Sequence, residues 1–214
     1  MHSRPFSIRA VLFDFDGTLT KPGALDFSVI KTAIECPPDQ SVLEFIEGLR
    51  EEKRKTEART ILKRFEMEAA ANSEPNDGAE DLIHHLLSEN LLIGIISRNS
   101  LESIERALLN FTGIERSFFR VIISRDESVK CKPSGDGILL AAQRLDVNVE
   151  DLLVVGDNIF DIHAGRDAGA LTVFLNNKPE SRTPAADSDY TISRMEELRS
   201  IIRTGRFLSA ETIR

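Results

Sequence analysis

Residues 10–20 read AVLFDFDGTLT, and this run combines a strand signal with a pair of acidic side chains. A short, continuous apolar run is typical of a strand that is buried on both faces. Extended residues i and i+2 point to the same side, so the carboxylates of Asp14 and Asp16 are expected to lie side by side. Gly17 permits a sharp departure of the backbone, and Thr18 adds a hydroxyl. We therefore predict a buried strand that ends at a functional acidic pair rather than at a solvated Asp-Gly turn.

Similar apolar runs recur along the chain and alternate with segments of helical periodicity. The predicted strands are 10–15, 91–97, 121–124, 152–155, 171–175 and, more weakly, 190–192. The predicted helices between them are 79–88, 101–111 (with Gly113 just beyond its end), 134–145 and the segment from Asp157 to Gly169. This alternation predicts an α/β fold, a doubly wound (Rossmann-like) parallel sheet covered by helices.

The segment between the first two strands departs from this alternation. Residues 20–77 carry no strand signal, whereas Ser41 and Glu44 have the spacing of a capping box and 57–71 has a helical apolar face. The charged stretch 51–55 is interpreted as a solvated turn. We expect a small helical cap at 20–77, inserted after the first strand of a core domain formed by 1–19 and 78–214.

Composition limits the classes of function and of location. The 214 residues carry a net charge of −8, which argues against a general nucleic-acid binder because such proteins need a basic face. No stretch approaches the ~20 apolar residues of a membrane span. The two cysteines, Cys36 and Cys131, have no metal-ligand spacing and suit a reducing compartment. A cytoplasmic protein with no membrane partner is expected.

Further polar residues follow the other predicted strands. In parallel α/β sheets the ligand crevice lies outside the carboxyl ends of the strands, so these residues are candidates for a common site. Taken singly, each has a simpler interpretation: Asp157 and Asp161 as a helix cap, Ser97 as another cap, and Lys132 as a surface lysine. Their order along the chain, each after its own strand, favours a shared site that binds a cation and a phosphate.

The ordered set formed by residues 14–19, Ser97, Lys132-Pro133, and Gly156-Asp157 with Asp161 resembles the four motifs of the haloacid dehalogenase (HAD) superfamily. The resemblance spans residues 10 to about 175. The helical insert resembles the cap of the phosphoglycolate-phosphatase-like branch. The resemblance implies a Mg²⁺-dependent phosphatase that acts on a small phosphorylated metabolite.

The resemblance also implies roles for individual residues. Asp14 would attack phosphorus and form an aspartyl-phosphate, and Asp16 would protonate the leaving oxygen and then activate water. Mg²⁺ would be held by the carboxylate of Asp14, the main-chain carbonyl of Asp16 and the carboxylate of Asp157. Ser97 and Lys132 would bind the phosphoryl oxygens.

Four more residues are expected to support the site: Asp161 from behind the first layer of ligands, Thr18, and the pair Arg98 and Asn99. Many relatives have Asn directly after the serine or threonine of the second motif, but here Arg98 intervenes. Thr20 stands in a segment where many relatives carry a further Asp. These departures lie on the substrate side, so the substrate stays open. A phosphomutase on a sugar phosphate, a dehalogenase and a non-catalytic binder are the alternatives.

Overall fold

The computed structural model describes residues 7–177 and 187–210, with side chains described up to residue 204. A sheet of six parallel strands forms its centre, in the order β3-β2-β1-β4-β5-β6. The strands are β1 (Ala10–Phe13), β2 (Leu92–Ile96), β3 (Phe119–Ile123), β4 (Leu152–Gly156), β5 (Leu171–Leu175) and β6 (Tyr190–Ile192). The predicted doubly wound α/β fold is confirmed.

Eight α-helices accompany the sheet in the described part of the chain. They are α1 (Phe27–Ala33), α2 (Val42–Gly48), α3 (Glu52–Asn72), α4 (Ala79–Ser88), α5 (Leu101–Leu108), α6 (Asp136–Leu145), α7 (Ile159–Ala168) and α8 (Leu198–Ala210). In these described residues, no helix combines the length and the hydrophobicity that crossing a membrane requires.

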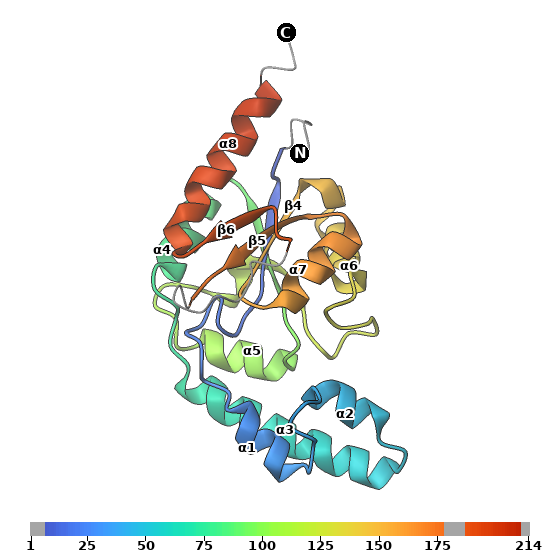
Figure 1. Cartoon of the computed structure of the whole chain (residues 1–214). Coiled ribbons are helices and arrows are strands. Elements are labelled where there is room, and N and C mark those ends of the chain that lie inside the picture. The colour runs from blue at the N-terminus through green and yellow to red at the C-terminus, as the bar shows by residue number, and fades with distance from the viewer. Residues whose placement is uncertain (1–6, 178–186, 211–214) are drawn as a thin grey trace.

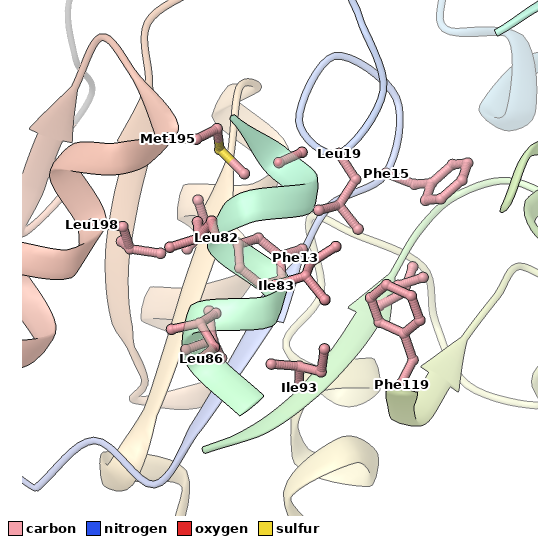
Figure 2. Close-up of a cluster of buried hydrophobic side chains, with 14 of the residues drawn as sticks. Phe13, Phe15, Leu19, Leu82, Ile83, Leu86, Ile93, Phe119, Met195 and Leu198 are labelled. Atoms are coloured by element: carbon pink, nitrogen blue, oxygen red, sulfur yellow. The ribbon is translucent and has the colours of Figure 1, made fainter. Parts of the chain in front are cut away.

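The apolar alternation within the strands builds one core on each face of the sheet. Val11 and Phe13 of β1 point into a cluster with α4, α5 and the start of α8. Figure 2 shows this cluster, in which Leu82 and Leu86 of α4 lie between Phe13 and Leu198. The neighbouring strand residues of β1 point to the opposite face, where α6 and α7 pack. Because both faces are covered, the central strands β1, β2 and β4 contain no polar side chain.

Helices α1, α2 and α3 form a separate group beside the sheet, next to α5 (Figure 1). They have a small hydrophobic cluster of their own that includes Ile30, Ile46 and Leu62. The far end of α3 leaves this group, because Ala70 belongs to the core that covers the sheet. Helix α3 therefore passes from one hydrophobic cluster to the other.

Several local predictions in this region were wrong. The Ser41 side chain makes no capping hydrogen bond to α2, and Glu44 instead forms an ion pair with Arg98. The charged stretch 51–55 is not a turn, since α3 already begins at Glu52. Helix α1 was not predicted, although Asp26 caps it by accepting hydrogen bonds from the backbone of residues 28 and 29. The ion pair of Glu44 with the distant Arg98 outweighs the local capping pattern at α2, whereas the cap of α1 was a local signal that the prediction overlooked.

Three helix ends in the sheet region also differ from the sequence prediction. Helix α5 ends at Leu108, before the expected Phe111 and Gly113. Helix α6 begins at Asp136 rather than at Ser134. Helix α7 begins at Ile159 and is capped by Asn158 rather than by Asp157, and Asp161 completes a capping box there. The interpretation of Asp161 as part of a helix cap is thus correct, and it applies alongside a second set of contacts in the site.

Candidate active site

The candidate site lies where the strand order of the sheet reverses. Strands β2 and β3 lie on one side of β1, and β4 and β5 lie on the other, so the boundary between β1 and β4 is a topological switch point. Asp14 continues β1 at this boundary and donates its backbone N–H to Val155 O of β4 at 2.8 Å. Asp14 and Asp157 thus come from neighbouring strand ends.

Lys132 lies at the centre of the buried part of the site. Its ammonium donates to Asp14 Oδ1 at 2.5 Å, to Asp161 Oδ1 at 2.6 Å and to Ile96 O at 2.8 Å. The side chain is 3% exposed, and despite the desolvation that disfavours the charged form, the adjacent carboxylates of Asp14 and Asp161 raise its pKa. The interpretation of Lys132 as a surface lysine was wrong. This ammonium holds Asp14 in a defined position.

Asp161 supports Lys132 from the helix behind it. Its Oδ1 accepts from Lys132, and its Oδ2 accepts the backbone N–H of Asn158 at 3.0 Å. Burial and the charge of Asp14 raise the pKa of Asp161 to about 6, although Lys132 opposes the rise. Gly156 makes room for this carboxyl, because a Cβ at that position would approach Asp161 Oδ2 to 2.2 Å.

The side chain of Asp16, the candidate acid and base, is held by an asparagine. Asn99 Nδ2 donates to Asp16 Oδ2 at 2.5 Å. Burial and the negative charge of Asp14 raise the pKa of Asp16 to about 7, although the Asn99 hydrogen bond works in the opposite direction. A carboxyl with a pKa near neutrality can donate or accept a proton at physiological pH.

Asp157 faces the turn that follows β1. Gly17 has φ of +81°, and a Cβ there would approach Asp157 Oδ2 to 2.3 Å, so only glycine fits. Asn177 donates to the carbonyl of Gly17 and, at 3.4 Å, to Asp157 Oδ2. Burial, together with the charges of Asp14 and Asp161, raises the pKa of Asp157 to about 7.

Two asparagines of the site were missed by the sequence analysis. Asn177 follows the end of β5, so the strand-end rule that selected Ser97 and Asp157 should also have selected it. Asn76 had no such signal, since it lies in the turn between α3 and α4. Its side chain donates to Thr18 O at 2.9 Å. Together they fix the turn that carries Gly17 and Thr18.

The remaining predicted residues also lie at the site. Ser97 is buried, and its hydroxyl accepts the backbone N–H of Asn99 at 3.1 Å. Thr18 donates to Asp14 Oδ2 at 3.4 Å. Arg98 points toward α2, where its Nη2 contacts both carboxylate oxygens of Glu44 at 2.7 and 2.8 Å, and its guanidinium lies 4.8 Å from the centre of the Phe160 ring. Arg98 thus joins the sheet domain to the helical insert.

The acidic cluster suits a hard cation. One carboxylate oxygen each from Asp14, Asp157 and Asp161 lies within 4.8 Å of the others. With Asp16 there are four carboxylates around a single ammonium, that of Lys132, and a divalent cation would balance the excess negative charge. Both oxygens of Asp161 accept short hydrogen bonds, at 2.6 and 3.0 Å, whereas Asp14 Oδ2 and Asp157 Oδ2 accept only contacts of 3.4 Å, so Asp14 and Asp157 are the more available carboxylate ligands. Mg²⁺ typically takes one or two protein carboxylates with waters and phosphate oxygens.

A cavity of about 520 Å³ opens above these groups. Its floor contains Asp14, Asp16, Ser97, Lys132 and Asp157, and its walls include Leu25, Val42 and Leu62 of the helical insert. The insert therefore covers the strand ends and limits the size of any molecule that reaches Asp14.

Comparison with known proteins agrees with this geometry. The family model of the haloacid dehalogenase-like hydrolases matches residues 8–169. The match covers most of the chain, so this protein belongs to the haloacid dehalogenase-like hydrolases. The resemblance inferred from the motifs is confirmed, as is the prediction of an enzyme of the hydrolase class.

Individual relatives share nearly the whole length of the chain. An uncharacterized hydrolase of Saccharomyces cerevisiae, YOR131C, is 31% identical over 96% of this chain and 94% of its own. The pyrophosphatase PpaX of Listeria monocytogenes is 29% identical (92% and 97%), and the N-acetylmuramic acid 6-phosphate phosphatase of Pseudomonas aeruginosa is 27% identical (91% and 95%). A hydrolase from Pseudomonas syringae shares the fold with a TM-score of 0.76 at 19% identity, over 92% of this chain and 98% of its own.

Proposed function

We propose that this protein is a Mg²⁺-dependent phosphatase that hydrolyses a small phosphate monoester through an aspartyl-phosphate on Asp14. The observation that carries the proposal is the position of Asp14, which lies at the floor of a covered cavity between the ammonium of Lys132 and the carboxyl of Asp16. Relatives named as phosphatases support the reaction class.

In the first step, an Asp14 carboxylate oxygen bonds to phosphorus while the bond from phosphorus to the ester oxygen breaks. The proton of Asp16 passes to the departing oxygen, so an alcohol leaves. Lys132 orients Asp14 through its 2.5 Å contact, and the hydroxyl of Ser97 would bind a phosphoryl oxygen. Positioning and charge stabilisation are the main requirements of phosphoryl transfer.

In the second step, the ionised Asp16 takes a proton from water, and the hydroxyl oxygen bonds to phosphorus. The bond to Asp14 breaks, so inorganic phosphate leaves and both aspartates return to their starting states. The carboxylates of Asp14 and Asp157 and the main-chain carbonyl of Asp16 would hold Mg²⁺, which supplies neutralisation of phosphoryl charge when bound. Asp161 keeps Lys132 in place throughout.

The substrate we propose is a small phosphorylated metabolite, since the cavity is covered by the helical insert at 20–77. The negative net charge and the acidic site do not favour nucleic acid. Cys36 and Cys131 are free, which suits the reducing cytoplasm as the compartment.

The test is a phosphate-release screen over a panel of phosphorylated metabolites with Mg²⁺, with Asp14→Asn as the blank. We expect release that EDTA abolishes and that Asp14→Asn lowers to background. Product analysis with sugar phosphates separates hydrolysis from a phosphomutase, and halide release without metal would instead indicate a dehalogenase. Wild-type turnover by the folded Asp14→Asn variant would exclude Asp14 as the nucleophile.

A further inference from the structure

Helix α3 carries a buried carboxylate that belongs to none of the sequence motifs. Glu66 is 3% exposed and lines the same cavity as Asp14. Along α3 it lies between Leu62, which packs in the cluster of α1–α3, and Ala70, which packs in the core that α4 and α5 form with the sheet. Glu66 is therefore located where the helical insert meets the sheet domain.

Arg125 pairs with this carboxylate from the loop after β3. Its Nη1 donates to Glu66 Oε1, and its Nη2 donates to Glu66 Oε2 at 2.9 Å. Planar two-point pairing of this kind fixes the orientation of both side chains. A buried ion pair pays a desolvation cost, so this geometry is weak evidence for stability and suggests a role in positioning.

Arg125 also fixes the loop that follows β2. Its Nη1 donates to Arg98 O at 3.0 Å, and its backbone N–H donates to Asn99 O at 2.9 Å. Two successive carbonyls of this loop are thus held by one residue. Asn99 in turn donates its side-chain amide to Asp16 Oδ2 at 2.5 Å and its backbone N–H to Ser97 Oγ.

These contacts form a continuous path from the helical insert to the acid/base candidate. We propose that Glu66 and Arg125 are positioning residues that set the orientation of the Asp16 carboxyl through Asn99, so that proton transfer to the leaving oxygen depends on the seating of α3. This inference rests on the proposed phosphatase function. It assigns a catalytic consequence to an ion pair that makes no contact with the reacting atoms.

The loss of rate that a misplaced Asp16 causes depends on the leaving group of the phosphate ester. An alkyl phosphate needs a proton from Asp16 as its ester bond breaks, whereas the nitrophenolate of p-nitrophenyl phosphate departs as an anion. A misplaced Asp16 therefore slows phosphorylation of Asp14 by the alkyl ester and leaves phosphorylation by the aryl ester nearly unchanged. A general loss of folding or of nucleophile position slows both esters equally.

The variants are Glu66→Gln and Arg125→Lys, which preserve approximate size and break the two-point pairing. The matched control is Glu102→Gln, because Glu102 pairs with Lys63 of the same helix α3 at 2.6 Å on the exposed surface. Single-turnover rates of leaving-group release, which report the phosphorylation of Asp14 alone, are measured in Mg²⁺ with an alkyl phosphate accepted by the wild type (release of the alcohol) and with p-nitrophenyl phosphate (release of nitrophenolate). Circular dichroism confirms folding, and Arg125→Lys replaces Glu66→Gln if the latter does not fold.

We expect a loss of roughly 10- to 100-fold with the alkyl ester and less than about threefold with the aryl ester, because one positioned acid typically contributes ~10²–10⁴. Glu102→Gln should match the wild type with both. Equal losses with the two esters, or wild-type rates in a folded Glu66→Gln or Arg125→Lys variant, overturn the positioning role. A wild type that releases no phosphate from any monoester overturns the proposed function instead, so the two failures are distinguishable.

Discussion

Replacing Asp157 by Asn tests the electrostatic design of the site most directly. Asp157 has a pKa of about 7 in the folded protein against an ordinary value of 3.8, because it is buried beside Asp14 and Asp161. The raised pKa means that the folded state binds a proton more tightly than the unfolded state. The corresponding stability is fully present below about pH 4 and is lost as the pH rises toward 7.

The magnitude follows from that difference in pKa. A change in pKa from 3.8 to about 7, at ~1.4 kcal/mol per pH unit, corresponds to a free energy of unfolding that is lower by roughly 4 kcal/mol when Asp157 is ionised in the metal-free site at pH 8. Asp157 is partly exposed and titrates together with its neighbours, so we expect about 2–4 kcal/mol. Asp157→Asn should therefore be more stable than the wild type at pH 8 in EDTA, with little difference at pH 4.

Magnesium should cancel most or all of this difference in stability. A cation at 100 times its dissociation constant stabilises the folded wild type by about 2.7 kcal/mol, while Asp157→Asn lacks a ligand and should gain little. The measurement is urea unfolding from pH 4 to pH 8, in EDTA and in MgCl₂. Asp39→Asn is the matched control, since Asp39 is an exposed aspartate in the loop between α1 and α2. A metal-free Asp157→Asn variant that is no more stable than the wild type at pH 8, or one that Mg²⁺ stabilises equally, would refute the reasoning.

Two further substitutions test the buried charges around Asp14. Lys132→Met leaves the carboxylates of Asp14 and Asp161 without their ammonium and should destabilise the protein by about 3–5 kcal/mol in urea unfolding, less at pH 5 than at pH 8 because a proton then replaces the lost charge. An equal loss at both pH values would contradict this account. Gly156→Ala places a methyl group 2.2 Å from Asp161 Oδ2 and should cost about 1–3 kcal/mol together with most of the activity, as measured by urea unfolding and phosphate release; wild-type values for both would show that Asp161 moves freely.

The sequence predicted the sheet because its strands carry their own signal. A strand buried on both faces is expected to be apolar along its length, and β1, β2 and β4 have that property without reference to any partner. The chain order of acidic and basic residues after those strands then predicted a shared site, since parallel strands bring their carboxyl ends to one edge. The helical insert was harder to predict: α1, a helix of seven residues, was missed because short helices depend on packing, and the start of α3 was interpreted as a solvated turn because its first residues are charged.

The sequence alone was enough to select Asp14 and Asp16 as candidate site residues, through their spacing after a buried strand. The tertiary structure decided what surrounds them. It placed Lys132 against Asp14 although 118 positions separate them, it paired Asn99 with Asp16, and it brought Asn177 and Arg125 into the site. A hydrogen bond between distant residues leaves no local pattern, because its partners are chosen by the packing of strands and helices. The sequence therefore identified the carboxylates that we propose as the reacting groups, and only the fold showed what positions them.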